Sequence, residues 1–377
     1  MLNTESFACT GCAACFASCP TKAICMTADG EGFAYPVIDP VTCIQCGLCE
    51  RVCPALAAKN KKEKDEPRPV LVAAAKLRGE GAREKSQSGG AFFALARATL
   101  AAGGVVYGAR LDADMRVHHA RAETEAEAEM LRGSKYVQSD VGESYAAVKR
   151  DLVGGRRVLF CGTPCQVAGL YAYLRGDHDG LLTADLICHG VPSPRLWADY
   201  LAWQEKRHKR KVTRAEFRDL SAPWGVSREA LWFGDKKVID TVFATLYYSR
   251  LALRPACYTC PFGKEQAVSD ITLGDFWGIE DTPLSDFADS RGVSAVVAHT
   301  EKGKEALLAS DMELRPTAFV DVAAKNPNLT APTARPAGRE KFWEEYERGF
   351  AGVARRYGGF TPKNRLKRII KRLLRRN

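Results

Sequence analysis

CTGCAACFASCP, at residues 9–20, places four cysteines and a proline within twelve positions near the start of the chain. The same spacing, C-x2-C-x2-C-x3-C-P, occurs again in CIQCGLCERVCP at residues 43–54. The segment between the two runs, AICMTADGEGFAYPVID, predicts two strands joined by a turn that contains Asp-Gly. Residues 1–57 are therefore predicted to form a small module with an internal pseudo-repeat, in which eight thiols lie close together.

This spacing is the signature of bacterial two-cluster ferredoxins, in which three closely spaced thiolates bind one [4Fe-4S] cluster and the fourth binds the other. It predicts that one cluster is bound by Cys9, Cys12, Cys15 and Cys53. The second cluster is predicted to be bound by Cys43, Cys46, Cys49 and Cys19. A pair of zinc sites or disulfides is the alternative, but zinc usually takes two separated pairs of ligands. Cys25 lies outside both runs and is predicted to be a small buried residue.

The composition is that of a soluble globular protein with room for two or three domains: 377 residues, 46% of them hydrophobic and 27% charged. The N-terminus lacks a basic segment followed by an apolar one, and no apolar run is long enough to span a bilayer. The fourteen cysteines are unevenly placed, which does not suit a disulfide scaffold. We therefore expect a cytoplasmic protein, in a compartment that keeps thiols reduced.

The net charge of +10 is concentrated at the C-terminus. The last fifteen residues hold eight Lys and Arg and no acidic residue, so the rest of the chain is close to balanced. Apolar residues recur there at helical spacing, at Leu366, Ile369, Ile370, Leu373 and Leu374. This pattern predicts an amphipathic helix, which either contacts an anionic membrane surface peripherally or packs on its own domain. No nucleic-acid role is expected, because no aromatic residues interleave with these bases.

The remainder of the chain predicts an α/β (α+β) body. Residues 58–69 are charged and proline-rich and predict a linker. Strand-like segments then alternate with helical ones, in an N-terminal part at 70–176, a C-terminal part at 177–335 and a helical tail at 336–377. Strands are expected in VLVAAAKL, VVYGARLD, RRVLFCG, LLTADLIC, SDITLGDFWG and GVSAVVAHT. Helices are expected in GGAFFALARATLAAGG, TPCQVAGLYAYL, SPRLWADYLAWQEKRHKR and REKFWEEYERGFAGVARRY.

Five further cysteines lie in this body: Cys161, Cys165, Cys188, Cys257 and Cys260. Cys165 follows one predicted strand, Cys188 ends another, and the remaining Cys-x2-Cys pair follows a helix. Strand ends at one edge of an α/β sheet converge on a common crevice, so four of these thiols are able to bind a third cluster. The alternative is that Cys161 and Cys188 are core residues and that the pair binds zinc.

Three short segments have the character of turns that receive an anionic cofactor. Ser88, Gly89 and Gly90 open one predicted helix, and Gly162 and Thr163 open another, so their backbone N–H groups are able to bind a phosphate. Ser134 and Lys135 lie on a loop, where a solvated surface lysine is the alternative. Neither a G-x-G-x-x-G dinucleotide fingerprint after a strand nor a P-loop is present.

The ordered set SGG, GSKYVQS, GTPCQ, CHG, CYTCPFG and SDITLGDFWGI resembles the coenzyme F-420 hydrogenase/dehydrogenase beta-subunit family over roughly residues 70–300. The resemblance implies an α/β body that binds FAD beside a [4Fe-4S] cluster. It implies third-cluster ligands at Cys165, Cys188, Cys257 and Cys260, with Cys161 left without a role. The fused ferredoxin module departs from the free-standing beta subunits. This departure argues against coenzyme F-420 as a reactant of this chain.

The resemblance also implies site residues for the flavin. FAD contacts are expected at Ser88, Gly89, Gly90, Ser134, Lys135, Gly162 and Thr163. Catalytic roles are expected for His189, Asp275 and Lys135, although His189 as a satisfied buried histidine is the alternative. Trp277 is expected to pack in the core rather than to line the flavin site.

Together these features predict an oxidoreductase that passes electrons from ferredoxin-type clusters through the body cluster to FAD and on to a two-electron acceptor. Soluble ferredoxin or another redox protein is the expected electron partner, and the small-molecule substrate is unspecified. The alternative is an electron-relay subunit that serves a partner oxidoreductase and has no substrate of its own.

Overall fold

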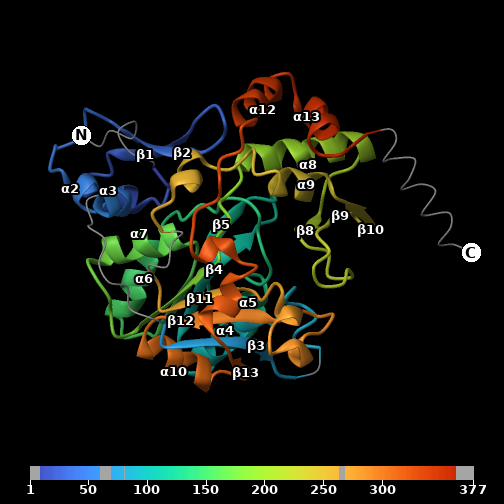
Figure 1. Cartoon of the computed structure of the whole chain (residues 1–377). Coiled ribbons are helices and arrows are strands. Elements are labelled where there is room, and N and C mark those ends of the chain that lie inside the picture. Colours follow the sequence, from blue (N-terminus) through green and yellow to red (C-terminus); the bar gives the residue numbers. More distant parts are fainter. Residues whose placement is uncertain (1–8, 60–68, 80, 263–267, 362–377) are drawn as a thin grey trace, which may run out of the picture.

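The computed structural model describes residues 9–59, 69–79, 81–262 and 268–361 (Figure 1). The amphipathic end of the predicted tail and most of the predicted linker lie outside the described residues. No helix in the described part of the chain is long and apolar enough to cross a membrane.

The head comprises α1 (Ala14–Ser18), β1 (Ile24–Ala28), β2 (Ala34–Ile38), α2 (Leu48–Arg51) and α3 (Pro54–Lys59). The strands β1 and β2 form an antiparallel hairpin, which confirms the predicted strand–turn–strand segment. The prediction of a buried Cys25 is wrong. Ile24 is buried and Cys25 is exposed, because successive residues of a strand face opposite sides and the outer side of this ribbon faces solvent.

One large mixed sheet forms the centre of the body, in the order β13-β3-β12-β11-β7-β6-β4-β5. Its neighbours β4, β6, β7 and β11 run parallel, and the remaining pairs are antiparallel. The strands are β3 (Leu71–Leu77), β4 (Val105–Leu111), β5 (Val117–Ala122), β6 (Val158–Cys161), β7 (Leu181–Leu186), β11 (Ile271–Asp275), β12 (Ser294–Ala298) and β13 (Met312–Pro316). This architecture confirms the predicted α/β class.

Helices cover both faces of the sheet. One face packs against α4 (Ala91–Ala101), α5 (Glu125–Glu129) and α10 (Glu301–Ala309), and the other packs against α6 (Ser144–Val153) and α7 (Pro164–Leu174). The short helix α11 (Phe319–Ala323) extends the second layer over β3. The strand β3 is made of alanines at its centre because it is buried on both sides: Ala73 and Ala75 face the α4 layer, while Ala74 faces the α11 layer.

A third region of the fold forms around α8 (Pro194–His208). It includes the small sheet β8 (Arg214–Glu216), β9 (Glu229–Phe233) and β10 (Lys236–Asp240), with α9 (Val242–Tyr248), α12 (Arg339–Tyr346) and α13 (Phe350–Arg356). The Ser-Pro start of α8 is confirmed, because the Ser193 hydroxyl accepts hydrogen bonds from the amides of Arg195 and Leu196. Phe33 from the head is fully buried in this region's core.

The single late helix predicted in REKFWEEYERGFAGVARRY is wrong, since the segment forms two helices, α12 and α13. The break falls at Gly349, which has a φ of 106° and precedes Phe350 at the start of α13. Glycine adopts this conformation without steric penalty, so the chain turns here and both apolar faces reach the same core.

Candidate functional site: three cysteine sets and the carboxyl edge of the sheet

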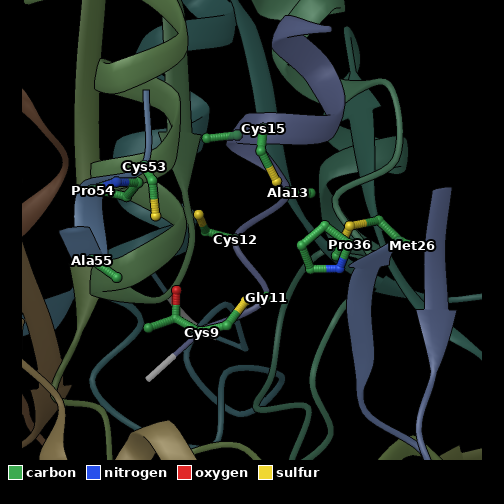
Figure 2. Close-up of a pocket in the computed structure, with 12 residues that line it drawn as sticks. Cys9, Gly11, Cys12, Ala13, Cys15, Met26, Pro36, Cys53, Pro54 and Ala55 are labelled. Atoms are coloured by element: carbon green, nitrogen blue, oxygen red, sulfur yellow. The ribbon is translucent and has the colours of Figure 1, made fainter. Parts of the chain in front are cut away.

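The first head set gathers around one cavity. Cys9, Cys12, Cys15 and Cys53 line it together with Gly11 and Pro54, as Figure 2 shows. Burial raises the pKa of the Cys15 thiol to about 12, and burial likewise raises the pKa of Cys12. Such thiols ionise at neutral pH only beside positive charge, which a metal centre supplies. Four convergent soft donors, two of them buried and two half-buried, therefore fit the predicted iron–sulfur cluster.

Backbone conformation lets this short loop wrap around the cavity. Gly11 has a φ of 70° and Ala13 a φ of 61°, so the chain curls tightly between successive cysteines. Ala13 then caps the five-residue helix α1, which carries Cys15. The fourth cysteine, Cys53, precedes Pro54 at the start of α3, a position where the missing proline N–H carries no penalty.

The second head set is more open to solvent. Cys19 follows α1, Cys49 lies in α2, and these two helices contact each other. Cys46 is exposed on the loop that leads into α2. The Cys19 sulfur accepts a hydrogen bond from the Ala23 amide at 3.2 Å. Cys49 lies close enough to Cys15 to oppose its ionisation, so the two head sets are neighbours.

The third set comes from three separate elements of the body. Cys165 lies in the first turn of α7, Cys188 follows β7, and Cys257 and Cys260 lie in or just after the 3-10 helix η2 (Pro255–Thr259). Burial, followed by the nearby thiols of Cys257, Cys165 and Cys260, raises the pKa of the Cys188 thiol. Cys161 stays apart: it is buried at the end of β6, and its charged neighbours are Asp185 and Lys135. The structure thus brings together the four body cysteines that the resemblance selects.

The head and body sets meet at α7. Both α1 and α3 pack on this helix, and Cys165 lies close enough to Cys12 to oppose its ionisation. The hydroxyl of Tyr145 shares its one hydrogen between the carbonyl oxygens of Cys12, at 2.9 Å, and Gln166, at 2.7 Å. The first head set and the body set are therefore adjacent.

The predicted cofactor-binding turns all lie at the carboxyl edge of the parallel strands. β3 runs in the same direction as β11, because both are antiparallel to β12. The Ser88–Gly90 turn follows β3, Asp275 ends β11, Cys188 and His189 follow β7, and Gly162 and Thr163 follow β6. This edge is where open α/β sheets bind ligands.

The Ser88–Gly90 turn packs tightly against the start of β12. The Ser88 hydroxyl lies 3.3 Å from the Val293 carbonyl oxygen and from the Ser294 hydroxyl. A β-carbon at Gly89 would lie 2.1 Å from the Ala75 carbonyl oxygen, so only glycine fits there. Gly90 has a φ of 88° and caps α4.

Ser134 and Lys135 lie beside this turn. The Ser134 amide donates to the Gln87 side chain at 3.2 Å. The Lys135 ammonium donates to the carbonyl oxygens of Leu131 at 2.8 Å and Arg132 at 2.7 Å, at the end of the turn that follows α5. Burial lowers the pKa of Lys135 to about 7. Its head group is therefore turned toward backbone oxygens of its own loop.

The amides of Gly162 and Thr163 are already engaged within the fold. The Gly162 amide donates to the Ala184 carbonyl oxygen at 3.1 Å, and the Thr163 amide donates to the Gln166 side chain at 3.0 Å. The Thr163 hydroxyl lies 3.2 Å from the Cys165 sulfur. In this arrangement Thr163 faces the body cysteine set.

Asp275 and His189 lie near each other beside the third cysteine set. The Asp275 carboxylate accepts hydrogen bonds from Arg218 at 2.8 Å and from the Trp224 indole at 2.9 Å. Burial lowers the pKa of His189, the charge of Arg250 lowers it further, and Asp275 opposes this shift. Trp277 is half-buried and stacks on Trp224 at a ring separation of 4.7 Å, so it belongs to this edge.

Sequence reasoning missed several residues that shape the site. Arg218 carries the positive charge opposite Asp275, and Tyr136 stacks on Tyr247 at 4.3 Å close to it. Arg254, three positions before Cys257, reaches the head. The only available sequence signal was an arginine within the otherwise apolar run before the Cys-x2-Cys pair. Within the described residues, no group of three or more His, Cys, Asp or Glu side chains has the geometry to hold a single metal ion.

Comparison with known proteins agrees with this organisation. Residues 155–315 match the family model for the C terminus of the "Coenzyme F420 hydrogenase/dehydrogenase, beta subunit", and residues 8–57 match the 4Fe-4S dicluster domain. A chain of the F420-reducing [NiFe] hydrogenase complex from Methanosarcina barkeri is similar to this one, with 16% identity and a TM-score of 0.48, over 77% of this chain and 97% of that chain. A search of curated proteins found no match. The chain thus joins a segment similar to the C terminus of the coenzyme F420 hydrogenase/dehydrogenase beta subunit, at residues 155–315, to one similar to a 4Fe-4S dicluster domain, at residues 8–57.

Proposed function

We propose that the chain is an iron–sulfur flavoprotein oxidoreductase, which passes electrons between its head, a third [4Fe-4S] centre in the body and FAD, and on to a two-electron acceptor. The observation that carries the proposal is the convergence of Cys165, Cys188, Cys257 and Cys260 at the carboxyl edge of the sheet, beside Cys12 of the head. The clusters would supply one-electron carriers, and the flavin would convert single electrons into pairs.

The residues of the body would hold these groups in defined ways. The Thr163 hydroxyl donates to the Gln166 side-chain oxygen at 3.0 Å, and it would turn its hydrogen to the Cys165 thiolate, 3.2 Å away, once that sulfur is ionised. The Val191 amide, 3.5 Å from the Cys257 sulfur, would donate to the Cys257 thiolate. Hydrogen bonds to sulfur stabilise the added electron and tune the potential.

The Ser88–Gly90 turn, with Ser134, would bind the anionic part of the flavin nucleotide through backbone N–H groups and hydroxyls. Arg218, paired with Asp275, would hold its guanidinium donors at the same edge. His189, with its pKa lowered by burial, would be neutral at pH 7 and able to accept or donate one proton at its ring. Lys135 would order the loop that bears Ser134.

Metal and flavin quantitation after anaerobic purification tests the proposal. About twelve irons and one FAD per chain are expected for three tetranuclear clusters and a flavin. Cys257→Ser should lose about four irons, whereas the matched control Cys161→Ser should lose none. The proposal would be overturned by about eight irons and no flavin in the wild type, with the same iron content in Cys257→Ser. That result would restrict the redox chemistry to residues 1–57.

A second candidate is an electron-relay subunit that serves a partner enzyme and has no substrate of its own. The family match favours it, because the family's description is of a beta subunit of hydrogenases and dehydrogenases. A ferredoxin or a similar redox protein would then exchange electrons at the head, where Cys46 is exposed. Co-purification of a stable stoichiometric partner, with no turnover by the isolated chain, would select this candidate.

A further inference from the structure

Arg254 is a fully buried arginine of the body that reaches into the head. Its guanidinium donates hydrogen bonds to the Cys9 carbonyl oxygen at 2.7 Å and to the Ala34 carbonyl oxygen at 3.0 Å. The same group lies 3.8 Å from the Cys9 sulfur, within hydrogen-bonding distance for sulfur. Its backbone amide is fixed by the Val191 carbonyl oxygen, just after the Cys188 loop. One side chain therefore connects a ligand of the first head set with the segment that bears the body set.

The surroundings of Arg254 hold it in a single position. Gln138 accepts a hydrogen bond from the guanidinium at 3.0 Å and itself donates to the Thr10 carbonyl oxygen at 3.0 Å. The Tyr35 ring lies 4.2 Å from the guanidinium carbon, a cation–π distance. A β-carbon at Gly11 would lie 2.6 Å from the guanidinium nitrogen, so glycine is needed where the loop passes over Arg254.

The charge of Arg254 has no carboxylate partner among the residues that the structure describes; its partners there are carbonyl oxygens, an amide and a cysteine sulfur. Burying an unpaired guanidinium costs several kcal/mol, so a counter-charge is required. Four thiolates around an iron–sulfur cluster carry a net negative charge, and Cys9 is one of the four. Reduction adds one electron to such a cluster and no proton, which increases the negative charge that faces Arg254.

We propose that Arg254 is the counter-ion of the head cluster bound by Cys9, Cys12, Cys15 and Cys53, and that it raises the reduction potential of this cluster while fixing the Cys9 loop against the body. Arg254 is a positioning residue in this role, because it acts on the cluster through Cys9. The inference needs the dicluster head alone. A failure of the third cluster or of FAD would leave it testable, since the head signals remain.

The test is an EPR-monitored redox titration of the anaerobically purified full chain, with iron quantitation on the same samples. Arg254→Gln should shift the head-cluster equilibrium at least tenfold toward the oxidised form, a midpoint about 59 mV lower for one electron. The cluster bound by Cys19, Cys43, Cys46 and Cys49 serves as the internal reference and should move less. Arg254→Lys, which keeps the charge, should shift the equilibrium less than Arg254→Gln does.

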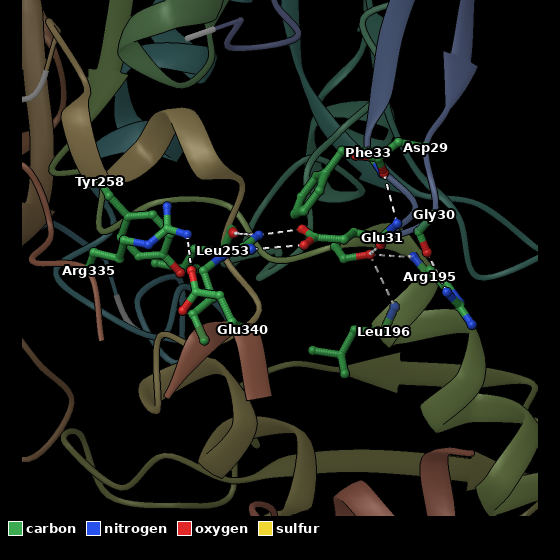
Figure 3. A network of polar contacts seen from close by, with 12 residues as sticks. Asp29, Gly30, Glu31, Phe33, Arg195, Leu196, Leu253, Tyr258, Arg335 and Glu340 are labelled. Carbon is green, nitrogen blue, oxygen red and sulfur yellow. Dashed lines mark hydrogen bonds and ion pairs between the residues drawn. The ribbon is translucent and has the colours of Figure 1, made fainter. Parts of the chain in front are cut away.

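Arg339→Gln is the matched control. Arg339 is also buried and also joins the body to the head, through Glu31 at 2.8 Å and the Leu253 carbonyl oxygen at 3.2 Å, but it touches no cysteine. Figure 3 shows Glu31 within this polar network, beside Arg195 and Leu253. This variant should leave the potential unchanged.

Two results would overturn the proposal. One is full iron content in Arg254→Gln with an unchanged head-cluster potential. The other is equal loss of iron in Arg254→Gln and Arg254→Lys. The proposal requires Arg254→Lys, which keeps the charge, to retain iron even where Arg254→Gln loses it. Equal loss would mean that the shape of the side chain, and not its charge, matters at this position.

Discussion

Gly169 of α7 faces Cys12 of the head so closely that a β-carbon at Gly169 would lie 3.2 Å from the Cys12 sulfur and 2.7 Å from the Tyr145 hydroxyl. The helix backbone and the loop that bears Cys12 therefore meet without an intervening side chain. Glycine in a helix interior lowers stability by roughly 0.5–1 kcal/mol relative to alanine, so its presence here reflects the close contact.

Gly169→Ala should consequently displace Cys12 and break the Tyr145 hydrogen bond to its carbonyl oxygen. We expect loss of up to four irons and a destabilisation of about 1–3 kcal/mol from overpacking, seen as a lower melting temperature. Gly352→Ala is the control, because Gly352 is exposed in α13 and a β-carbon there would have no atom within 4 Å. Full iron and an unchanged melting temperature in Gly169→Ala would contradict this prediction.

Lys135 gives a pH-dependent prediction. Burial lowers its pKa from 10.5 to about 7, so between these values the unfolded chain binds a proton that the folded chain does not. The free energy of unfolding of the wild type, compared with that of a variant without the amine, therefore rises with pH across this range. Below about pH 7 the folded chain also carries the proton, so the buried charge destabilises the fold to its full extent. The slope approaches about 1.4 kcal/mol per pH unit.

Melting temperatures of the wild type and Lys135→Met between pH 6.5 and 9 (roughly the range in which the folded lysine loses its proton) measure this effect. The wild type should gain on the variant as the pH rises. Lys341→Met, which removes an exposed lysine of α12, controls for the loss of one positive charge. A constant difference between wild type and Lys135→Met would show that the amine keeps its ordinary ionisation in the fold.

The hydroxyl of Thr163 should tune the reduction potential of the proposed third cluster. Thr163→Val removes the group that lies 3.2 Å from the Cys165 sulfur, so the cluster should become harder to reduce, by a few-fold to tenfold in its equilibrium, or up to about 59 mV. Thr163→Ser keeps the hydroxyl and should restore the wild-type potential. Equal potentials for the valine and serine variants in a redox titration would exclude the hydrogen bond as the cause.

The Arg218–Asp275 pair should behave as one unit. The two side chains are only 8% and 15% exposed, and removal of one partner leaves the other charge buried. Asp275→Asn or Arg218→Met alone should cost about 3–5 kcal/mol, and the double variant should cost less than the sum. A double-mutant cycle on melting temperature measures the coupling, and strict additivity would show that the two groups act independently.

The local features of the fold were predictable because each depends on neighbouring residues. The alternation of strands and helices, the Ser193–Pro194 start of α8 and the glycine-closed α4 follow from short-range preferences. The break at Gly349 was missed because the apolar period continues across it, and only the conformation of that glycine separates α12 from α13.

The cysteine sets were predictable from spacing in the head and from the resemblance in the body. The contacts that join them were not, because they link residues far apart in the chain. Arg254 and Cys9 are separated by 245 positions, and no periodicity connects them. Lys135 illustrates the same limit: its sequence context suggests a cofactor contact or a solvated charge, whereas its ammonium is held by the carbonyl oxygens of its own loop.

Phe33 belongs to the hairpin of the head but is buried in the core around α8, and Glu31 beside it is held by Arg339. Movement of the head away from the body would remove the Phe33 ring from this core. It would also leave the Arg339 guanidinium without its partner Glu31. The head therefore cannot act as a swinging arm that collects an electron at one site and delivers it at another. On the proposed electron path the gap between head and body has a constant width, so the rate of electron exchange across it should be independent of solvent viscosity and of the length of the segment that joins them.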